Sequence, residues 1–290
     1  MENCDRQNLS ISACIDELRV TIMKTEPLAL HHQSIIAPAW KKLCIDYDLH
    51  FAEYSFANAY LFRKKHAFQL IECETPCVMG QFKNKNFYII PSVSPKSIQL
   101  KLPECTQGKT YCFFPIPEVW IEEFKGMGMS STTCRADTDY LFHVTKLQTM
   151  AGRELSSRRN LLNQLERNFK VESRWLEGKE IAKALDLLEL WHKQSGESQE
   201  KTDYLSCKEA LELMPQLQLF GRIIYADQQV IGFSIGELLT PGTALLHFAK
   251  SLHEVKGTTP YLYRDFALHL PSTAVDKYGT RFRNSCVKTS

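Results

Sequence analysis

The sequence predicts an α+β fold built from two units, each with a mainly antiparallel sheet. Its 290 residues exceed what one small core needs and suit two domains of ordinary size. In each half, apolar residues at helical spacing are followed by short runs of β-branched and aromatic residues that turn residues separate. Because short runs joined by tight turns pair antiparallel, this order favours two related α+β units over a parallel βαβ array.

Composition indicates a folded protein that is not embedded in a membrane. Hydrophobic residues make up 44% and charged residues 23% of the chain, the balance of an ordinary globular surface. No run approaches the roughly 20 consecutive apolar residues that a membrane-spanning helix requires. The first residues, with Glu2, Asp5 and Arg6, contain no apolar signal-peptide region. We therefore expect a cytoplasmic protein without a transmembrane segment.

The ten cysteines are expected to be reduced thiols. A chain of this length without an export signal rarely uses a disulfide framework. Cys73 and Cys77 are separated by three residues, but no second close cysteine pair or pair of spaced histidines completes a zinc site. We expect no bound metal.

The first half of the chain has the features of one α+β unit. We expect a poorly defined leader over residues 1–30, with one short helix near 15–23, and a first unit over 31–135. Apolar positions fit helices within 36–65 and 119–124, and the strand-like runs are 68–71, 77–82, 87–90 and 111–114. Pro76 and the polar residues 84–86 supply turns between these runs.

The second half, 136–290, repeats the order of helices, meander and helix. After Gly152, Leu155, Leu162 and Leu165 fall on one face of a predicted helix. Further helices are expected near 179–193, 206–214 and 258–269, and three strand-like runs cover 219–225, 230–237 and 244–250. Polar turns at 227–229 and Pro241-Gly242 break these runs, which predicts an antiparallel meander.

Positive charge is concentrated at the start of this second half. Between Lys146 and Lys179 there are eight basic and four acidic residues, whereas the whole chain has a net charge of only +2. A local excess of cations points to a local anionic partner.

The order of several motifs resembles a known family. These motifs are Tyr-Leu-Phe-Arg-Lys-Lys-His at 60–66, Asp-Thr-Asp-Tyr at 137–140, Gly-Arg-Glu-Leu-Ser-Ser-Arg-Arg-Asn at 152–160, Gly-Arg-Ile-Ile at 221–224, Val-Ile-Gly-Phe-Ser-Ile-Gly-Glu at 230–237 and His-Phe-Ala-Lys at 247–250. Together they resemble the C-terminal domain of phosphatidylglycerol lysyltransferase, the aminoacyl-phosphatidylglycerol synthase family, over roughly residues 35–269.

The resemblance implies a tandem GNAT-like fold and an acyl-transfer activity. An aminoacyl group would move from aminoacyl-tRNA to an anionic phospholipid or a small-molecule acceptor, with no cofactor. Such a reaction needs a deprotonated nucleophile, a stabilised oxyanion and a held polyanion. The resemblance implies catalytic roles for His247 and Lys250. The site is expected between the two units, with the second unit supplying most of it. The implied substrate-binding residues are Asp137, Asp139, Tyr140, Arg158, Arg159, Asn160 and Gly257.

Each of these residues also has a plainer interpretation. Adjacent arginines on an amphipathic helix usually form a solvated face, a histidine on an apolar strand is usually a core residue, and a lysine at a strand end is usually a surface charge. Gly257 precedes a predicted helix where GNAT-like folds hold a pyrophosphate, but the fuller glycine-rich loop of coenzyme A users is absent. Two alternatives therefore stay open: a CoA-dependent N-acyltransferase, and a degenerate domain that binds an anionic ligand without turnover.

The sequence departs from the family pattern in two places. Where relatives carry an acidic residue between His247 and Lys250, this chain has Ala249. After Tyr278 the usual basic tail is not recognisable, so we expect the second unit to lack its final strand. An open sheet edge or a poorly ordered tail would then lie beside Lys250.

Overall fold

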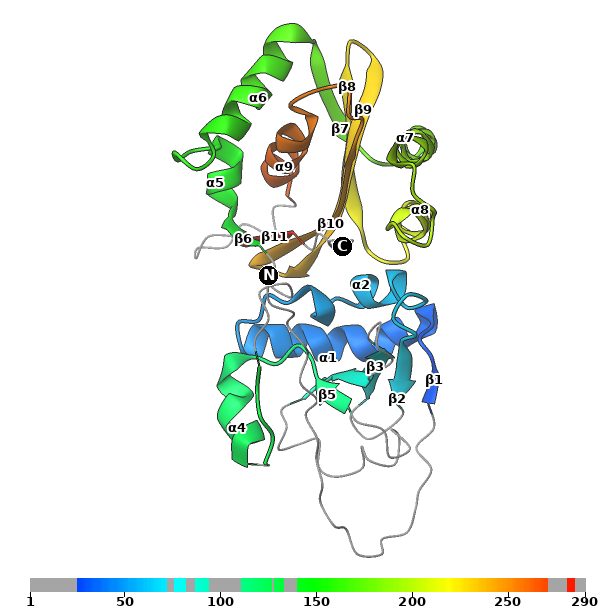
Figure 1. Ribbon diagram of the computed structural model, residues 1–290, viewed down its shortest axis with the longest axis vertical. Coiled ribbons are helices and arrows are strands. Elements are labelled where there is room, and N and C mark those ends of the chain that lie inside the picture. The colour runs from blue at the N-terminus through cyan, green and yellow to red at the C-terminus, as the bar shows by residue number, and fades with distance from the viewer. Residues whose placement is uncertain are drawn as a thin grey trace, which may run out of the picture. The chain divides into compact units, whose positions relative to one another are not determined.

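The structure, a computed structural model, describes residues 25–71, 76–81, 87–93, 111–126, 128–132, 140–270 and the backbone of 281–284. Contacts within the chain define two compact units, Met1–Thr138 and Asp139–Ser290 (Figure 1). The sequence placed the limit three residues earlier, after residue 135. The short helix expected near residues 15–23 lies outside the described residues.

In the described residues of the first unit, a five-stranded sheet is accompanied by one long helix and two short ones. The sheet order is β1 (Thr25–Pro27), β2 (Gln69–Ile71), β3 (Cys77–Gln81), β4 (Phe87–Ile90) and β5 (Tyr111–Phe113). Neighbouring strands are antiparallel except for the parallel pair of β4 and β5. The helices are α1 (Gln33–Asp46), α2 (Phe56–Leu61) and the short α4 (Ile121–Gly126), with 3-10 turns at Leu30–His32, Ala52–Tyr54 and Glu118–Trp120.

Local sequence explains these elements. Ile36, Trp40 and Leu43 recur at helical spacing in α1 and are buried. Ser55 caps α2, because its hydroxyl accepts a hydrogen bond from the backbone N–H of Asn58 at 2.9 Å. In β3, a Cβ atom at Gly80 would lie 2.5 Å from the Phe68 ring, so this strand position requires glycine.

The second unit contains a six-stranded sheet. The strand order is β6 (Tyr140–His143), β11 (Arg281–Asn284), β10 (Thr243–Ser251), β9 (Gln229–Thr240), β8 (Phe220–Ala226) and β7 (Val171–Trp175). Among the described residues, the helices that accompany it are α5 (Val144–Thr149), α6 (Ser156–Asn168), α7 (Lys179–Ser195), α8 (Tyr204–Glu212) and α9 (Thr258–Leu268). The predicted meander is confirmed, because β8, β9 and β10 pair antiparallel in sequence order.

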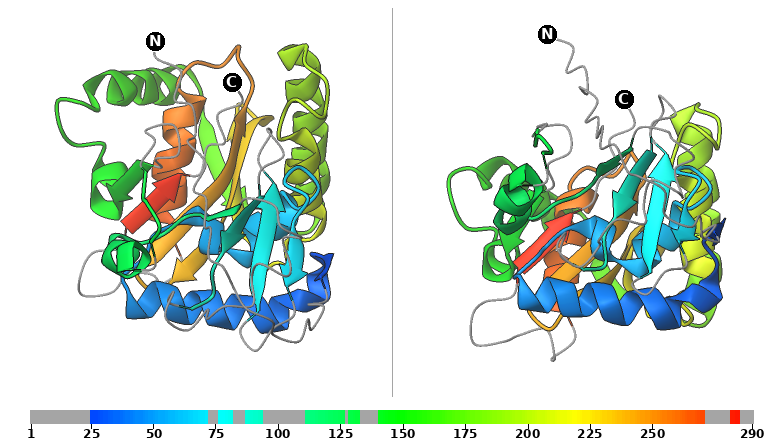
Figure 2. Two further views of the ribbon diagram at one scale, coloured as in Figure 1. Left: turned by 60° about the horizontal axis from the view of Figure 1, so that its bottom comes forward. Right: turned by 90° about the horizontal axis from the view of Figure 1, so that it is seen from below.

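Helices cover both faces of this second sheet. Helices α5, α6 and α9 lie on one face and α7 and α8 on the other (Figures 1 and 2). On the α9 face, Leu246 and Ala244 of β10 pack against Leu147 of α5 and Phe266 of α9. Side chains on the central strands are therefore enclosed whichever way they point. The predicted α+β class with mainly antiparallel sheets is confirmed.

The expectation that the second unit lacks its final strand is corrected. Strand β11 pairs parallel with β10 over Thr243–Leu246 and antiparallel with β6, so it fills the position between them. This pairing ends before Lys250, so the expected open edge beside Lys250 itself stays a prediction. A run of four residues is too short to show a recognisable alternation of apolar and polar residues. Backbone pairing on both sides, which sequence reading does not reveal, defines this strand.

His66 makes the stability of the first unit depend on pH. Its ring stacks on Phe68, with centroids 5.3 Å apart, and meets the Tyr88 ring edge-on. Burial, aided by the nearby Lys65 charge, lowers the pKa of His66 from 6.5 to about 4. The folded pKa lies below the unfolded one, so this contribution to stability is complete above about pH 6.5 and is lost as the pH falls toward 4.

We predict that the free energy of unfolding attributable to this site falls by about 2.5 kcal/mol between about pH 7.5 and pH 4.5. Urea denaturation of the full chain at each pH, followed by a spectroscopic signal from the first unit, measures this free energy. His66→Phe retains an aromatic ring without a titrating group and should lose less stability over the same interval. An equal loss in both proteins would show that other groups cause the pH dependence.

Candidate functional site

A β-bulge places His247 at a distinct position in β10. Leu246 pairs with Gly236 of β9, but Phe248 pairs with the next residue, Ile235. His247 is therefore the extra residue that no residue of β9 opposes. Bulges of this kind redirect a side chain and interrupt the ladder, and they are frequent next to active sites.

The His247 side chain is buried and holds a carboxylate. Its Nε2 atom lies 2.8 Å from Oε1 of Glu237 on β9, and the two side chains are 0% and 15% exposed. An ionised carboxylate only accepts hydrogen bonds, so Nε2 carries the proton that joins the pair. The other ring nitrogen, Nδ1, is buried and has no hydrogen-bond partner within the described part of the chain.

Glu237 supplies a carboxylate that the sequence analysis considered absent. Ala249 follows His247 where relatives carry an acid, but Glu237 pairs with Leu245 in the sheet and so lies on the adjacent strand beside His247. Cross-strand neighbours of this kind are within side-chain reach. Glu237 closes the motif at 230–237, and only its pairing register could have linked it to His247.

The buried side chain of Lys250 links β10 to α7 and to the start of α8. Its Nζ atom lies 2.6 Å from Oδ1 of Asp203, which precedes α8, and 3.6 Å from the ring centroid of Trp191 on α7. The Lys250 side chain is 8% exposed, so it is not the surface charge of the plainer interpretation. Both contacts satisfy the ammonium group, through an ion pair and a cation–π interaction.

The groups near Lys250 are poor nucleophiles. Cys207 on α8 is fully buried, and this burial raises the pKa of its thiol, which the Lys250 charge lowers only in part. Burial and a hydrogen bond to Glu189 raise the pKa of Tyr204 to about 12. Both groups therefore stay protonated at neutral pH and act as packing or hydrogen-bonding groups.

Arg158 and Arg159 have different surroundings. Arg159 Nη1 donates to the carbonyl oxygen of Met150 at 2.6 Å and of Gly152 at 3.3 Å, beyond the C-terminal end of α5. Met150 there has a left-handed backbone with φ of 50°, and the guanidinium satisfies carbonyls that the helix leaves unpaired. Arg158 is exposed and stays available for an anion.

Much of the local cation excess is neutralised in the structure. Glu154 lies 2.5 Å from Lys146, and this contact lowers the pKa of the Glu154 carboxyl. Glu172 similarly holds Lys170 and Arg174, each at 3.1 Å. Glu166 instead pairs at 2.8 Å with Arg264, which lies outside this basic segment, so it neutralises none of these cations. The anion-binding prediction is thus reduced mainly to Arg153, Arg158 and Lys179, which are all exposed.

Asn160 lines a solvent-open depression along α6, with Ser157, Gln164 and Arg167 among the other lining residues. Hydroxyl and amide groups at helical spacing offer both donors and acceptors there. Arg167 also donates to the Asn163 carbonyl within the helix at 3.1 Å. This polar face is separate from the buried His247 side chain.

Gly257 is explained by close packing of two helices. It has φ of +94° immediately before α9, and a Cβ atom there would lie 2.3 Å from the carbonyl oxygen of Leu161 on α6. Both the backbone conformation and the approach of α6 require glycine. A carbonyl oxygen beside the start of α9 opposes phosphate binding there.

The remaining predicted residues lie apart from His247. Asp137 and Asp139 fall outside the described residues. Tyr140 begins the edge strand β6, is 58% exposed and stacks with Phe142 at a centroid distance of 6.3 Å. The predicted site residues that the structure describes therefore fall into three separate places. His247 and Lys250 are buried on β10, Tyr140 lies on the β6 edge, and the others lie on α6 or pack against it.

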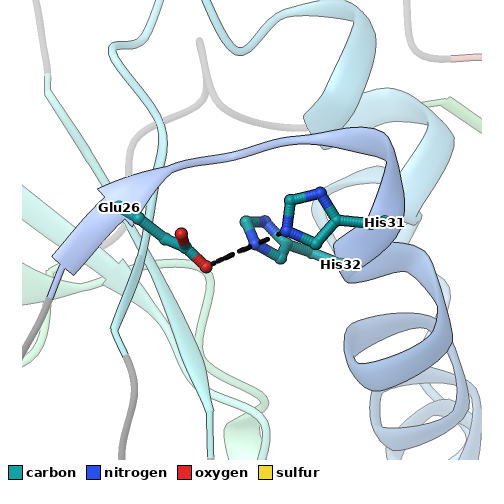
Figure 3. Close-up of side chains that lie close together, drawn as sticks. All are labelled: Glu26, His31 and His32. Carbon is teal, nitrogen blue, oxygen red and sulfur yellow. Dashed lines mark hydrogen bonds and ion pairs between the residues drawn. The ribbon is translucent and has the colours of Figure 1, made fainter.

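A cluster of potential metal ligands occurs in the described part of the first unit, and the sequence analysis did not single it out. Ligand atoms of Glu26, His31 and His32 lie within 4.8 Å of one another (Figure 3). His32 Nε2 is 2.7 Å from Glu26, and its Nδ1 accepts the Ala29 N–H at 3.0 Å. The ring proton is therefore on Nε2, where a metal would bind. The hydrogen bond between His32 and Glu26 is therefore better explained as a structural contact that holds the 3-10 turn against β1.

Among the described residues, no helix is long and apolar enough to cross a membrane.

Comparisons with known proteins identify the family. The family model for the C-terminal domain of phosphatidylglycerol lysyltransferase matches residues 46–278. The chain belongs to this family, as its motifs suggested. No curated protein sequence matches the chain.

Solved structures agree with the fold. A conserved protein of unknown function from Bacteroides thetaiotaomicron is 17% identical, with a TM-score of 0.77 over 90% of this chain and 89% of that chain. The C-terminal domain of a putative lysylphosphatidylglycerol synthetase from Agrobacterium fabrum is 12% identical, with a TM-score of 0.55 over 85% and 78%. A tandem GNAT protein from the clavulanic acid biosynthesis pathway is 10% identical, with a TM-score of 0.45 over 90% and 89%. The family match therefore points to an aminoacyl-phosphatidylglycerol synthase-like domain, and the first two of these structures agree with its fold.

We predict that Arg159→Met lowers the free energy of unfolding by about 1.5 kcal/mol, because it removes a charged donor from carbonyls at the end of α5. Arg158→Met is the matched control and should change stability by less than about 0.5 kcal/mol. Urea denaturation of both variants measures the difference. Equal stability of the two variants would show that the Arg159 contacts contribute nothing.

Lys250→Met should lower the free energy of unfolding by about 3 kcal/mol, because it leaves the Asp203 carboxylate without its buried partner. The double variant with Asp203→Leu should recover most of this loss, since an apolar pair replaces an ion pair at little net cost. Urea denaturation measures both. A double variant less stable than Lys250→Met would indicate that Asp203 is stabilised by other groups.

Proposed function

We propose that this chain is an aminoacyltransferase that moves an aminoacyl group from aminoacyl-tRNA to an anionic phospholipid or a small-molecule acceptor. The family match over residues 46–278 carries this proposal, and the name of the family supplies an aminoacyl group and a phospholipid acceptor. The aminoacyl-tRNA donor is what the resemblance implies. A cytoplasmic location belongs to the proposal, because charged tRNA is available in that compartment.

The second unit offers groups suited to this chemistry. His247 at the bulge is held by a carboxylate, as a general base requires. Arg158 and Arg153 are exposed cations that suit the phosphates of tRNA or of a lipid headgroup. Asn160 and Tyr140 offer exposed polar groups near these cations in sequence, and Asp137 and Asp139 are proposed to hold the substrate amine.

Lys250 and Arg159 take supporting roles in this proposal. Lys250 keeps α7 and α8 on the sheet face that carries His247, and Arg159 fixes the end of α5 from which α6 starts. Gly257 permits the close approach of α6 to α9. These three positions therefore support the site through packing and do not themselves need to contact substrate.

Two other functions make different predictions. A CoA-dependent N-acyltransferase needs a phosphate site at a helix start, and the Leu161 carbonyl beside Gly257 disfavours one at α9. A binding domain without turnover is favoured by the enclosure of both His247 and Lys250, whose side chains are 0% and 8% exposed. The donor that the chain uses separates these functions.

The test is a transfer assay with the full chain. Bulk tRNA charged with radiolabelled amino acids is offered with vesicles containing phosphatidylglycerol or with small amines, and acetyl-CoA is offered in parallel. We predict that label moves from tRNA to an acceptor. Arg158→Ala should raise KM for the charged tRNA at low salt and flatten its salt dependence, because one phosphate contact is lost. Lys193→Ala, an exposed cation of α7 outside the segment Lys146–Lys179, is the control and should leave KM unchanged.

Transfer from acetyl-CoA alone would replace this proposal with the CoA-dependent function. Binding of charged tRNA or vesicles without transfer from any donor would support the binding domain.

A further inference from the structure

The unpaired Nδ1 atom of His247 is a buried polar group without a partner. Leaving such an acceptor unsatisfied costs about 1–3 kcal/mol, so its presence in a strand calls for an explanation. Within the described residues of the second unit, Ser234 Oγ and His192 Nδ1 share this condition. The Ser234 hydroxyl can rotate, and the His192 ring is half-buried and stacks on Tyr204 with centroids 4.5 Å apart. His247 alone among these three combines complete side-chain burial with a carboxylate on its other nitrogen.

Glu237 determines which nitrogen of the His247 ring carries the proton. The carboxylate accepts the proton of Nε2 at 2.8 Å, which leaves a lone pair on Nδ1 in the neutral ring. The bulge sets this ring apart from the regular ladder. A carboxylate behind one imidazole nitrogen, with a lone pair on the other, is the arrangement that orients a histidine base and stabilises the imidazolium it becomes.

The other charged groups identified on this face are engaged elsewhere. Lys250 forms an ion pair with Asp203 at 2.6 Å and a cation–π contact with the Trp191 ring. On α7, Glu180 accepts from the Tyr225 hydroxyl and pairs with Lys183 at 3.3 Å. None of these contacts uses the His247 ring, whereas Glu237 does.

We propose that Glu237 and His247 form a base dyad in which Nδ1 of His247 receives a proton from an acceptor with a nucleophilic amine or hydroxyl. This proposal rests on the acyl-transfer function proposed above. Glu237 is the positioning residue, and His247 is the group that contacts the acceptor. The acceptor N–H or O–H also provides the hydrogen bond that Nδ1 lacks.

The step balances without an oxidant, a reductant or a metal. The acceptor nitrogen or oxygen forms a bond to the acyl carbon, and its proton passes to Nδ1. The bond between the acyl carbon and the ester oxygen of the donor then breaks. The proton on Nδ1 passes to that departing oxygen, which leaves as a hydroxyl and restores the neutral ring.

The first arm of the test uses transfer rates of the full chain. His247→Gln should lower kcat/KM by about 10²–10⁴-fold, the usual contribution of a general base. Glu237→Gln should lower kcat with little change in KM, because the ring loses the carboxylate that orients it. His192→Gln, which removes the other histidine with an unpaired Nδ1, is the control and should leave kcat and KM unchanged. A Glu237→Gln variant with unaltered kcat overturns the dyad while the transfer function stands.

The second arm does not depend on turnover. Nitrogen-15 NMR of labelled histidines in the full chain reports which ring nitrogen carries the proton, and the signal missing from His247→Gln, or from His247→Asn if the former does not fold, assigns the ring. We expect the proton on Nε2 and an unprotonated Nδ1 at neutral pH. This tautomer supports the dyad even if no transfer is detected, in which case only the proposed function fails. A proton on Nδ1 overturns the dyad whatever the transfer assay shows.

Discussion

Helices cover both faces of the second unit's sheet, so every polar side chain on its central strands needs a buried partner. Arg222 on β8 donates to Asp265 on α9 at 3.0 Å, with both side chains 5% exposed. On the opposite face, Tyr225 donates to Glu180 of α7, and Lys250 binds Asp203 before α8. Breaking such a pair leaves an uncompensated buried group, which costs far more than an exposed pair contributes. These contacts therefore fix which part of each helix lies over which strand.

His247 departs from this rule in an informative way. Its partner, Glu237, comes from the neighbouring strand and not from a covering helix, and one ring nitrogen stays without a hydrogen bond. The bulge that makes this possible also breaks the regular ladder of β10. The side chains of Lys250, Arg222 and Tyr225 each have a hydrogen-bond partner within the protein. At His247, in contrast, Nδ1 has no partner among the described residues and can accept a hydrogen bond from a substrate. Buried groups that stability alone does not explain are where functional chemistry is expected.

The sequence predicted the parts of this fold that depend on local pattern. Apolar spacing identified α6 through Leu162 and Leu165, and turn residues identified the β8–β10 meander, because both signals lie within a few neighbouring residues. It did not predict the pair of Glu237 and His247, which depends on strand register and on a one-residue bulge. It also missed the Arg159 contacts with the end of α5, since the sequence shows a cation but not the direction of its side chain. Motif order found the family, but the surroundings of each residue required the fold.

The central claim is that Glu237 and His247 act as one catalytic unit, and a double-mutant cycle on transfer rates tests it most directly. Rates are measured for the unmodified chain, Glu237→Gln, His247→Gln and the double variant under one set of conditions. If Glu237 acts only through His247, the double variant should be no slower than His247→Gln alone, because residues that work as a unit lose their effect together. Additive losses in the double variant would contradict the account.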